Sequence, residues 1–587
     1  MCGIIGVVSG IDFKVSFLLE RLKRLEYRGY DSYGYSDSRK TVKSLGAIKA
    51  EGLSLTRIGI AHTRWSTHGG VTRANAHPHE SCNGEVIIAH NGIIENYWEL
   101  KTILERQGHK FRSETDSEVV AHYFEEKIKQ GKGVKKAISD FLKEVSGTFA
   151  ILMMIKGEDK IYAIKRDSPL VLGICEGKKA GAKQIQKHIL ASDIYAFSDI
   201  TDKAVFFEND EFAVVEAGAY EFYDAKGSLI KKKVQSFEWN QEEGKKKDYK
   251  HFMIKEIEEE PLVVSRMLLS LDHEQKDQFK KLVSLVKKSR KIIFAACGTS
   301  YHASLLGAFY LHTTGIEAQT LIASEFKHYA NVDKDTLVIA ISQSGETMDV
   351  IDALKYAQEK KATIVSLVNV PYSTIQRMSA LSLNILAGQE VAVASTKAFV
   401  NQSVLLLRLA QEFGYKVNLS NLGEKIKGIF SQKDDIKRIA KQVSSSRDAY
   451  VLGRGQTYPV AREIALKVKE ITYMHAEGMM GGELKHGTIA LIDKGTPVIS
   501  LIGCNDEDMV SNTKEVEARG AEIITITNNA SQCRGSAKNT VFIDTDNDGK
   551  FGILACVAGQ LLAYYVAEAL GREIDKPRNL AKSVTVK

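Results

Sequence analysis

The second half of the chain contains an internal duplication, which constrains its fold more than any other feature. One copy begins KIIFAACGTSYHASLLGAFYL and the other begins DAYVLGRGQTYPVAREIALKVKE, and Gly298 of the first aligns with Gly455 of the second. In each copy an apolar strand leads into a glycine-containing loop and a helix, and a second strand, loop, helix and strand follow. Because apolar strands that alternate with helices form parallel sheets covered on both faces, we expect two α/β domains, over residues 281–420 and 440–577.

The first half has a different texture, in which short β-rich runs such as GEVIIAHNG alternate with turns. It is followed by a dense run of charges over residues 231–261, whose first part has no apolar periodicity. We therefore place a boundary near residues 238–250. The expected order is an N-terminal domain over 2–238, a linker and connecting helix over 239–280, the two repeats, and a C-terminal tail over 578–587.

Composition excludes several classes of protein. The 587 residues are 44% hydrophobic and 26% charged, as in soluble globular proteins, and the net charge of +7 is too small and dispersed to indicate nucleic-acid binding. No stretch approaches the roughly 18 uninterrupted apolar residues of a membrane span. The N-terminus MCGIIGVVSG lacks the basic flank and long apolar core of a signal peptide. We expect a cytoplasmic protein without nucleic-acid or membrane partners.

The cysteines indicate neither a disulfide framework nor a zinc site, because their number is odd, they are scattered, and no CxxC occurs. Any cysteine chemistry is expected to be that of a single thiol. Cys2 is the candidate, since removal of Met1 would place its thiol beside its own α-amine. That amine has an unperturbed pKa of about 8 and could act as an internal general base, producing the reactive thiolate.

Other polar groups in the first half could complete a site. Arg64, in GIAHTRWSTHGG, could hold a carboxylate by a bidentate fork. Asn91 and Gly92, in IIAHNGIIEN, could form an oxyanion hole, and Asp116, in SETDSEVV, could bind an ammonium group at a helix start. Taken singly, Arg64 could be a surface ion pair, Asn91 a turn former and Asp116 an N-cap.

Three loops of the first repeat, CGTSYHA, AISQSGETMDV and EVAVASTKAF, are rich in hydroxyl groups. Hydroxyls and free backbone N–H groups at a helix N-terminus suit a phosphate, although a single such turn is often only a cap. The Walker pattern GxxxxGK[ST] is not found, so a nucleoside triphosphate is not implied. The residues expected at the phosphate are Thr299, Ser300, Ser342, Gln343, Ser344, Thr347, Val393 and Ser395.

The second repeat lacks SQSGET, which indicates one phosphate site for the pair of repeats. It contributes Lys467 and Glu470, which share one face of a helix, and His486, which could titrate near neutrality. The tail PRNLAKSVTVK carries Lys582 and would be ordered only by docking. Without further context, the helical pair could be an ordinary ion pair and Lys582 a flexible surface lysine.

Taken together, the motifs resemble known families. MCGIIG, RLEYRGYDSYG, HTRWSTHG, AHPH, HNGIIEN and SETDSEV resemble the N-terminal-nucleophile glutamine amidotransferase domain, with Ser66 where relatives often have Ala. CGTSY, SQSGET and ASTKAF resemble the flavodoxin-like sugar isomerase (SIS) domain. End to end, including the PRNLAKSVTV tail, the chain resembles the isomerizing glutamine–fructose-6-phosphate aminotransferases. The resemblance implies an αββα glutaminase domain followed by two SIS domains with parallel sheets.

The family resemblance also implies a reaction, in which glutamine and fructose 6-phosphate give glutamate and glucosamine 6-phosphate, the first step of hexosamine synthesis. It implies no metal and no organic cofactor, and a homodimer in which a neighbouring subunit's histidine completes the sugar site in some members. In the glutaminase half it implies that Cys2 supplies the nucleophile and the base, and that Asn91 and Gly92 form the oxyanion hole. It also implies that glutamine is bound by Arg64, Asp116, Thr67 and His68. Trp65 would gate an ammonia channel.

In the sugar half the resemblance implies that His486 assists ring opening and that Lys582 forms a Schiff base with the open ketose. Glu470 would move a proton between C1 and C2, with Lys467 beside it. Since a lysine must be neutral to attack a carbonyl, we expect burial or a neighbouring cation such as Lys467 to favour the neutral amine of Lys582.

Two alternatives remain open on sequence. An amidotransferase of another pathway, such as purine synthesis, would share Cys2 and Arg64 but carry a phosphoribosyltransferase half. A non-catalytic phosphosugar sensor would carry a DNA-binding helix-turn-helix region and would not need Cys2, Glu470 or Lys582.

Overall fold

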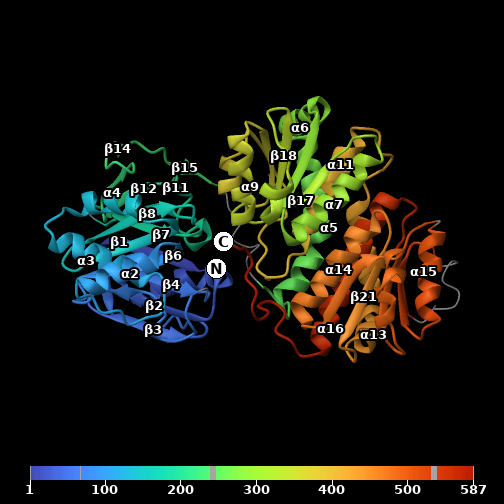
Figure 1. Ribbon diagram of the computed structural model, residues 1–587, viewed down its shortest axis with the longest axis horizontal. Coiled ribbons are helices and arrows are strands. Elements are labelled where there is room, and N and C mark those ends of the chain that lie inside the picture. The colour runs from blue at the N-terminus through green and yellow to red at the C-terminus, as the bar shows by residue number, and fades with distance from the viewer. Residues whose placement is uncertain are drawn as a thin grey trace. The chain divides into compact units, whose positions relative to one another are not determined.

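The computed structural model describes residues 2–66, 68–180, 183–237, 246–504, 506–529 and 539–585. The chain divides into two compact units, one of residues Met1–Glu242 with Ser583–Lys587 and one of residues Glu243–Lys582 (Figure 1). Each unit has its own sheets and its own hydrophobic core.

The first unit is built on two sheets of antiparallel strands. The first sheet has the order β15-β11-β9-β10-β1-β4-β2-β3, with β1 Gly3–Lys14, β2 Ser32–Ser36, β3 Thr41–Leu45, β4 Leu55–Arg64, β9 Val171–Ala180, β10 Lys183–Ala191, β11 Lys203–Phe206 and β15 Gln235–Ser236. The second has the order β14-β13-β12-β8-β7-β6-β5, with β5 His79–Glu80, β6 Val86–Ile94, β7 Gly147–Ile155, β8 Lys160–Arg166, β12 Glu211–Glu216, β13 Tyr220–Tyr223 and β14 Leu229–Ile230.

The two sheets pack face to face, because alternate residues of their strands are apolar on the inner side. Ile4 and Ile60 of one sheet share a buried cluster with Leu152 of the other. On the outer faces, α1 (Val15–Lys23) covers β1 and β4, and α3 (Glu118–Lys129) and α4 (Val134–Glu144) cover the second sheet; α2 (Tyr97–Arg106) packs beside α3. This layering confirms the predicted αββα sandwich.

The second unit contains two five-stranded parallel sheets (Figure 1). One has the order β17-β16-β18-β19-β20 and the other β22-β21-β23-β24-β25, so both have the flavodoxin-like order 2-1-3-4-5. The strands are β16 Lys291–Ala296, β17 Gln319–Ile322, β18 Thr336–Ser342, β19 Thr363–Val368, β20 Leu381–Asn384, β21 Asp448–Gly453, β22 His475–Met480, β23 Pro497–Ile502, β24 Glu522–Thr527 and β25 Thr540–Phe542. The identical order confirms the predicted duplication.

The aligned glycines have the same backbone conformation in both repeats. Gly298 has φ +53° and Gly455 has φ +49°, and each follows the first strand of its sheet. A side chain is strained in this left-handed region, so glycine is the residue that allows the chain to turn from strand to helix at this point.

Helices of both repeats share one continuous core, in which Ala303, Leu406, Ile464 and Leu561 are all buried. The helices of the unit are α5 Phe252–Asp272, α6 Lys276–Lys288, α7 Gly298–His312, α8 Phe326–Tyr329, α9 Met348–Glu359, α10 Thr374–Arg377, α11 Lys397–Gln411, α12 Leu422–Ile429, α13 Lys433–Val443, α14 Thr457–Thr472, α15 Glu507–Glu517 and α16 Asp548–Ala569. The segment predicted as linker and connecting helix thus contains α5, which packs on α11 and α12 within this core. The domain limits given above stay predictions.

Helix α16 is long and apolar enough to cross a membrane, with a mean hydropathy of 1.5 in its most apolar window. That window is 89% buried inside the protein, against α13 and α14. Burial of this kind is what the central helix of a soluble domain shows, so α16 is accounted for as a core element.

Candidate functional site

Cys2 lies at the start of β1, where the loop after β4 passes over it. The Trp65 N–H donates to Cys2 Sγ at 3.3 Å, and the Asn91 side-chain amide donates to the Cys2 carbonyl at 3.0 Å. Burial raises the pKa of the Cys2 thiol, while the positive chain terminus, the Trp65 N–H and the Arg64 charge act in the opposite direction. A thiol whose pKa is raised needs a base at hand to become a thiolate.

The structure brings the predicted oxyanion residues next to Cys2. Asn91 and Gly92 lie in β6. The side-chain oxygen of Asn91, Oδ1, is buried without a hydrogen-bond partner. Gly92 has φ +125°, and a Cβ built there would lie 1.9 Å from the Thr148 carbonyl oxygen. Only glycine fits at this position, which holds the backbone beside Asn91 in place.

Arg64 is buried at the end of β4 and holds the loop that follows it. Its guanidinium donates to the carbonyls of His68, Gly69 and Gly70, at 3.1 Å and 3.0 Å for the last two. The expected bidentate contact with a carboxylate would therefore replace contacts within this loop. His68 packs edge-on against Tyr97 with ring centroids 6.0 Å apart. Thr67 lies outside the described residues.

Asp116 is buried just before α3, and its Oδ2 accepts the Ile94 N–H at 2.7 Å. The predicted glutamine-binding residue is thus anchored to the end of β6, the strand that carries Asn91. Trp65 contacts Cys2 through its backbone, whereas its side chain packs edge-on against Tyr30 at 5.8 Å.

Sequence reasoning gave no role to a group of buried histidines on β4, β5 and β6 and just before β5. His62 and His77 have ring centroids 4.1 Å apart, and His77 and His79 are 4.5 Å apart. His90 Nδ1 lies 2.8 Å from Ser117 Oγ, beside Asp116. Burial lowers the pKa of His62 to about 3 and lowers those of the other histidines of the group, so the cluster is neutral at pH 7. The motifs AHPH and HNG contain three of these histidines, His77, His79 and His90, and could have indicated the cluster.

The cluster predicts a loss of stability in acid. Between about pH 6.5 and about pH 3 the unfolded chain holds a proton on His62 that the folded chain lacks, so the free energy of unfolding falls as the pH falls. From about pH 7 to about pH 5, His62 alone should contribute a loss of about 2 kcal/mol. Urea unfolding followed by pulsed hydrogen exchange in β4 and β6 measures the free energy of unfolding of this unit at each pH. His62→Gln should make that free energy depend less steeply on pH. A first unit equally stable at both pH values would contradict it.

In the second unit, six of the eight predicted phosphate residues lie at the carboxyl ends of β16 and β18, which are neighbours in the sheet, whereas Val393 and Ser395 lie in the segment between β20 and α11. This is the point where the strand order reverses, the usual ligand position of such folds. Ser342 Oγ accepts the Gly345 N–H at 3.0 Å and lies 3.2 Å from Thr347 Oγ1. Ser344 Oγ accepts the Glu346 N–H at 3.1 Å. Gln343 is half-buried in the same loop.

Thr347 is the N-cap residue of α9, but its side chain makes no capping hydrogen bond. Gly345 has φ +65°, and a Cβ there would lie 2.0 Å from Ser373 Oγ, so the loop requires glycine. Ser300, at the β16 end, accepts a hydrogen bond from Gln402 of α11 at 3.0 Å. The loop as a whole offers hydroxyls and a helix N-terminus to an anion.

Thr299 connects the first repeat to α14 of the second. Its Oγ1 donates to Glu463 at 3.0 Å and accepts from Lys467 Nζ at 3.0 Å. Lys467 is fully buried and forms ion pairs with Glu463 at 3.4 Å and Glu470 at 2.7 Å. Burial opposes its charge, but the two carboxylates outweigh burial and raise the pKa of Lys467. His302 also contacts Glu463, at 2.8 Å.

Lys582 is docked on the first repeat rather than free in solution. Its Nζ lies 2.6 Å from Glu390 Oε2 and 2.8 Å from the Ala392 carbonyl, and its side chain is 3% exposed. Burial alone would raise the pKa of Glu390, but Lys582 and a hydrogen bond from Ser395 hold it at about 2. Val393 is buried in the same segment.

This arrangement differs from the expectation that a cation such as Lys467 favours a neutral Lys582. The contact of Lys582 is the anion Glu390, and Lys467 is itself paired with Glu463 and Glu470. Sequence reasoning missed Glu390 and Glu463 as partners, although Glu390 begins the motif EVAVASTKAF.

The structure does not join His486 to these groups. It lies at the end of a short 3-10 helix, Glu483–His486, after β22, and it is exposed. Within the described residues it has no hydrogen bond or ion pair. Among the predicted sugar-site residues, Thr299 of the first repeat contacts Lys467 of the second, and Lys467 contacts Glu470.

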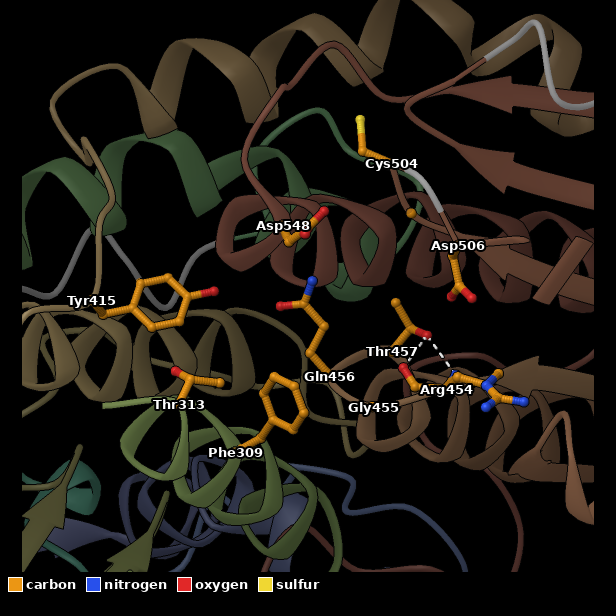
Figure 2. A pocket seen from close by; sticks show the side chains of 11 residues that line it. Phe309, Thr313, Tyr415, Arg454, Gly455, Gln456, Thr457, Cys504, Asp506 and Asp548 are labelled. Atoms are coloured by element: carbon orange, nitrogen blue, oxygen red, sulfur yellow. Dashed lines mark hydrogen bonds between the residues drawn. The ribbon is translucent and has the colours of Figure 1, made fainter. Parts of the chain in front are cut away.

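The second repeat has a cavity of about 400 Å³ at the equivalent reversal of its own sheet, after β21 and β23 (Figure 2). There Asp506 caps α15 by accepting the Met509 N–H at 3.0 Å, and Asp548 also lines the cavity. Arg454, at the rim, is paired with Asp508 at 2.8 Å. Carboxylates at the helix N-terminus disfavour a phosphate there, which agrees with one phosphosugar site for the pair.

Comparison with known proteins places this geometry in a family. Models of the glutamine amidotransferase domain and the SIS domain match residues 1–242 and residues 285–411 and 442–568, respectively. Two curated relatives are both named glutamine–fructose-6-phosphate aminotransferase (isomerizing). The one from Methanothermobacter thermautotrophicus is 38% identical and the one from Aquifex aeolicus 39%, each over 100% of both chains.

A solved structure agrees with these relatives. The C-terminal domain of glucosamine-fructose-6-phosphate aminotransferase from Francisella tularensis is 33% identical, with a TM-score of 0.51, and covers 57% of this chain and 100% of its own. Since the full-length relatives match every part of the chain, from the cysteine loop to the docked tail, the chain belongs to the family of isomerizing glutamine–fructose-6-phosphate aminotransferases.

Proposed function

We propose that this protein hydrolyses glutamine and uses the ammonia to convert fructose 6-phosphate into glucosamine 6-phosphate, the first step of hexosamine synthesis. The observation that carries the proposal is that one chain unites a half-buried Cys2 beside an amide donor with a docked lysine on a duplicated SIS core. The full-length relatives carry the name of this activity. A cytoplasmic location stays a prediction.

In the glutaminase half, Cys2 attacks the side-chain amide of glutamine after removal of Met1 exposes its α-amine as base. The Asn91 amide and the Gly92 N–H stabilise the oxyanion of the tetrahedral intermediate. Collapse releases ammonia and leaves a thioester, which water hydrolyses to glutamate. Asp116 and Arg64 hold the α-amine and α-carboxylate of glutamine. The 3.0 Å contact of Asn91 with the Cys2 residue supports this assignment.

In the sugar half, the loop from Ser342 to Thr347 binds the phosphate and Lys582 forms the imine with the open ketose. Proton loss from Lys582 must precede that attack, and Glu390 is the contacting carboxylate. Glu470 moves a proton between C2 and C1, while the charged Lys467 holds Glu470 at 2.7 Å. Because His486 is exposed here, we propose a homodimer in which the partner subunit's His486 assists ring opening.

The phosphate assignment predicts weak sugar binding in the double variant Ser344→Ala with Thr347→Ala. Each hydroxyl on a charged group contributes about 1.5–3 kcal/mol, so the affinity for fructose 6-phosphate should fall at least about tenfold. Calorimetric titration measures it. Ser379→Ala is the matched control, since its hydroxyl bonds the Ile375 carbonyl in the same domain. An unchanged affinity in the double variant would count against this loop.

The gating assignment predicts that Trp65→Ala uncouples the two halves. The Cys2 contacts of Trp65 come from its backbone, so glutamine hydrolysis should survive loss of the indole, whereas ammonia should escape to water. Glutamate should exceed glucosamine 6-phosphate in the products. Trp98→Ala, at an exposed tryptophan of α2, should keep the two products equal. Equal products in Trp65→Ala would refute the gate.

A further inference from the structure

We propose that Cys82, His109, His122 and Glu125 form a binding site for a divalent transition metal of the zinc type within the glutaminase unit. Cys82 lies in the turn between β5 and β6, His109 follows α2, and His122 and Glu125 are one turn apart on α3. Their ligand atoms all lie within 4.8 Å of one another. The four residues come from three segments, so a bound ion would join the second sheet to the loop after α2 and to α3.

The separations fit a tetrahedral centre. With zinc–sulfur at about 2.3 Å and zinc–nitrogen or zinc–oxygen at about 2.0–2.2 Å, ligand sulfur and nitrogen are about 3.6 Å apart, and nitrogen and oxygen about 3.4 Å. Cys82 Sγ lies 3.7 Å from His109 Nδ1 and 3.5 Å from His122 Nδ1. Glu125 Oε2 lies 3.1 Å from His109 Nδ1 and 3.8 Å from His122 Nδ1.

The outer nitrogens of both rings face carboxylates. His109 Nε2 lies 3.2 Å from Glu126 Oε2, and His122 Nε2 lies 3.5 Å from Glu118 Oε1. A metal-bound histidine characteristically donates its second N–H to a carboxylate, which fixes the ring and increases its basicity. Both histidines of the cluster have this arrangement. The Lys110 N–H also points at Cys82 Sγ, at 3.3 Å, as suits a thiolate.

Without a metal, the protons of the cluster do not balance. A neutral imidazole offers one N–H and one lone pair, yet both ring nitrogens of His109 lie within hydrogen-bond distance of carboxylates, at 3.1 Å from Glu125 and 3.2 Å from Glu126. A bound cation removes the conflict, because both Nδ1 lone pairs then bind the metal and both Nε2–H groups donate to carboxylates.

The ligand set favours a closed structural site. His109, His122 and Glu125 are buried, and four protein ligands leave no open position for a substrate. Thiolate with imidazole selects zinc or a similar metal over magnesium or calcium. The thiolate and the Glu125 carboxylate together balance a 2+ ion.

The site is linked to the glutamine site through Glu118. While Oε1 of Glu118 faces His122, its Oε2 accepts from the Ser113 N–H at 2.7 Å and hydroxyl at 2.6 Å, in the loop that leads to Asp116. Metal loss should therefore raise the KM for glutamine several-fold more than it changes kcat. This consequence rests on the proposed role of Asp116, whereas metal content does not.

The test is zinc content by mass spectrometry in untagged full-length protein, made in zinc-supplemented medium and washed with chelator. Wild type should retain about one zinc per chain, and Cys82→Ser should retain little. Glu118→Gln should weaken zinc binding by about 10–100-fold, as outer carboxylates typically do. Cys175→Ser, at a buried thiol of β9, and Cys2→Ala should both retain the metal, which excludes binding at other thiols.

Cobalt substitution keeps the proposal testable if Cys82→Ser fails to fold. Cobalt in the wild-type site should give tetrahedral d–d bands and a thiolate-to-cobalt charge-transfer band, and Cys175→Ser should keep both. Wild type that holds no more zinc than Cys82→Ser, or cobalt-loaded wild type without the thiolate band, would overturn the site. These readouts are independent of glutaminase and synthase activity.

Discussion

Replacing Cys2 with alanine should lower glutamine hydrolysis by at least about 10³-fold, because losing the nucleophile of a hydrolase removes the covalent route altogether. Fructose 6-phosphate binding should be unchanged, since every group assigned to the sugar belongs to the other unit. Glutamate release measures the first effect and calorimetric titration with the sugar phosphate the second.

Cys175→Ala is the matched control, as it removes a buried thiol of β9 in the same unit, whose charged neighbours are Lys187, Arg21 and Asp199. Full glutaminase activity in Cys2→Ala would exclude Cys2 as nucleophile. Intact-protein mass spectrometry adds a second check. Active enzyme should lack Met1, because with Met1 retained the α-amine of Cys2 is bound in a peptide and cannot act as base.

Replacing Lys582 with arginine should abolish glucosamine 6-phosphate synthesis. Arginine keeps the positive charge and can still pair with the buried Glu390, so the fold should not lose that ion pair, but it cannot deprotonate and attack a carbonyl. Borohydride added with fructose 6-phosphate should leave a stable sugar adduct on wild-type protein. Peptide mapping should place it on Lys582, and Lys582→Arg should lose both the adduct and synthesis.

Lys576→Arg, in the same C-terminal segment, is the control and should keep adduct and synthesis. Glutaminase activity measured without sugar should be similar in all three proteins. An adduct on Lys467, or full synthesis by Lys582→Arg, would refute the assignment. The structure already argues against Lys467 as the nucleophile, since two carboxylates raise its pKa.

The fold could be predicted because its signals are local. Strand-loop-helix texture and the aligned glycines Gly298 and Gly455 report directly on backbone conformation, and both glycines have positive φ. Motifs marked Asn91, Gly92 and Asp116 as candidates, and the structure has Asn91 and Gly92 within β6 and Asp116 just before α3; their roles stay predictions. The docking of the tail was a requirement of the chemistry proposed for Lys582, and the structure has this contact.

Partners that are distant in sequence could not be predicted. Glu390 faces Lys582 across 192 residues of chain, and Glu463 reaches Thr299 across 164, so no spacing rule relates them. The proposed metal site could not be predicted for the same reason, because its first histidine follows Cys82 by 27 residues and the sequence has no CxxC motif there. Burial also changed an expected role. Lys467, which looked like a helper cation for Lys582, is held by carboxylates of its own helix.

The central claim is that one chain couples glutamine hydrolysis to amination of a ketose phosphate. The most direct test incubates the purified protein with glutamine and fructose 6-phosphate and measures glutamate and glucosamine 6-phosphate together. We predict that both products form in equal amounts and that glucosamine 6-phosphate disappears when either substrate is omitted. Glutamate without any glucosamine 6-phosphate in the wild-type protein, or neither product, would contradict the claim.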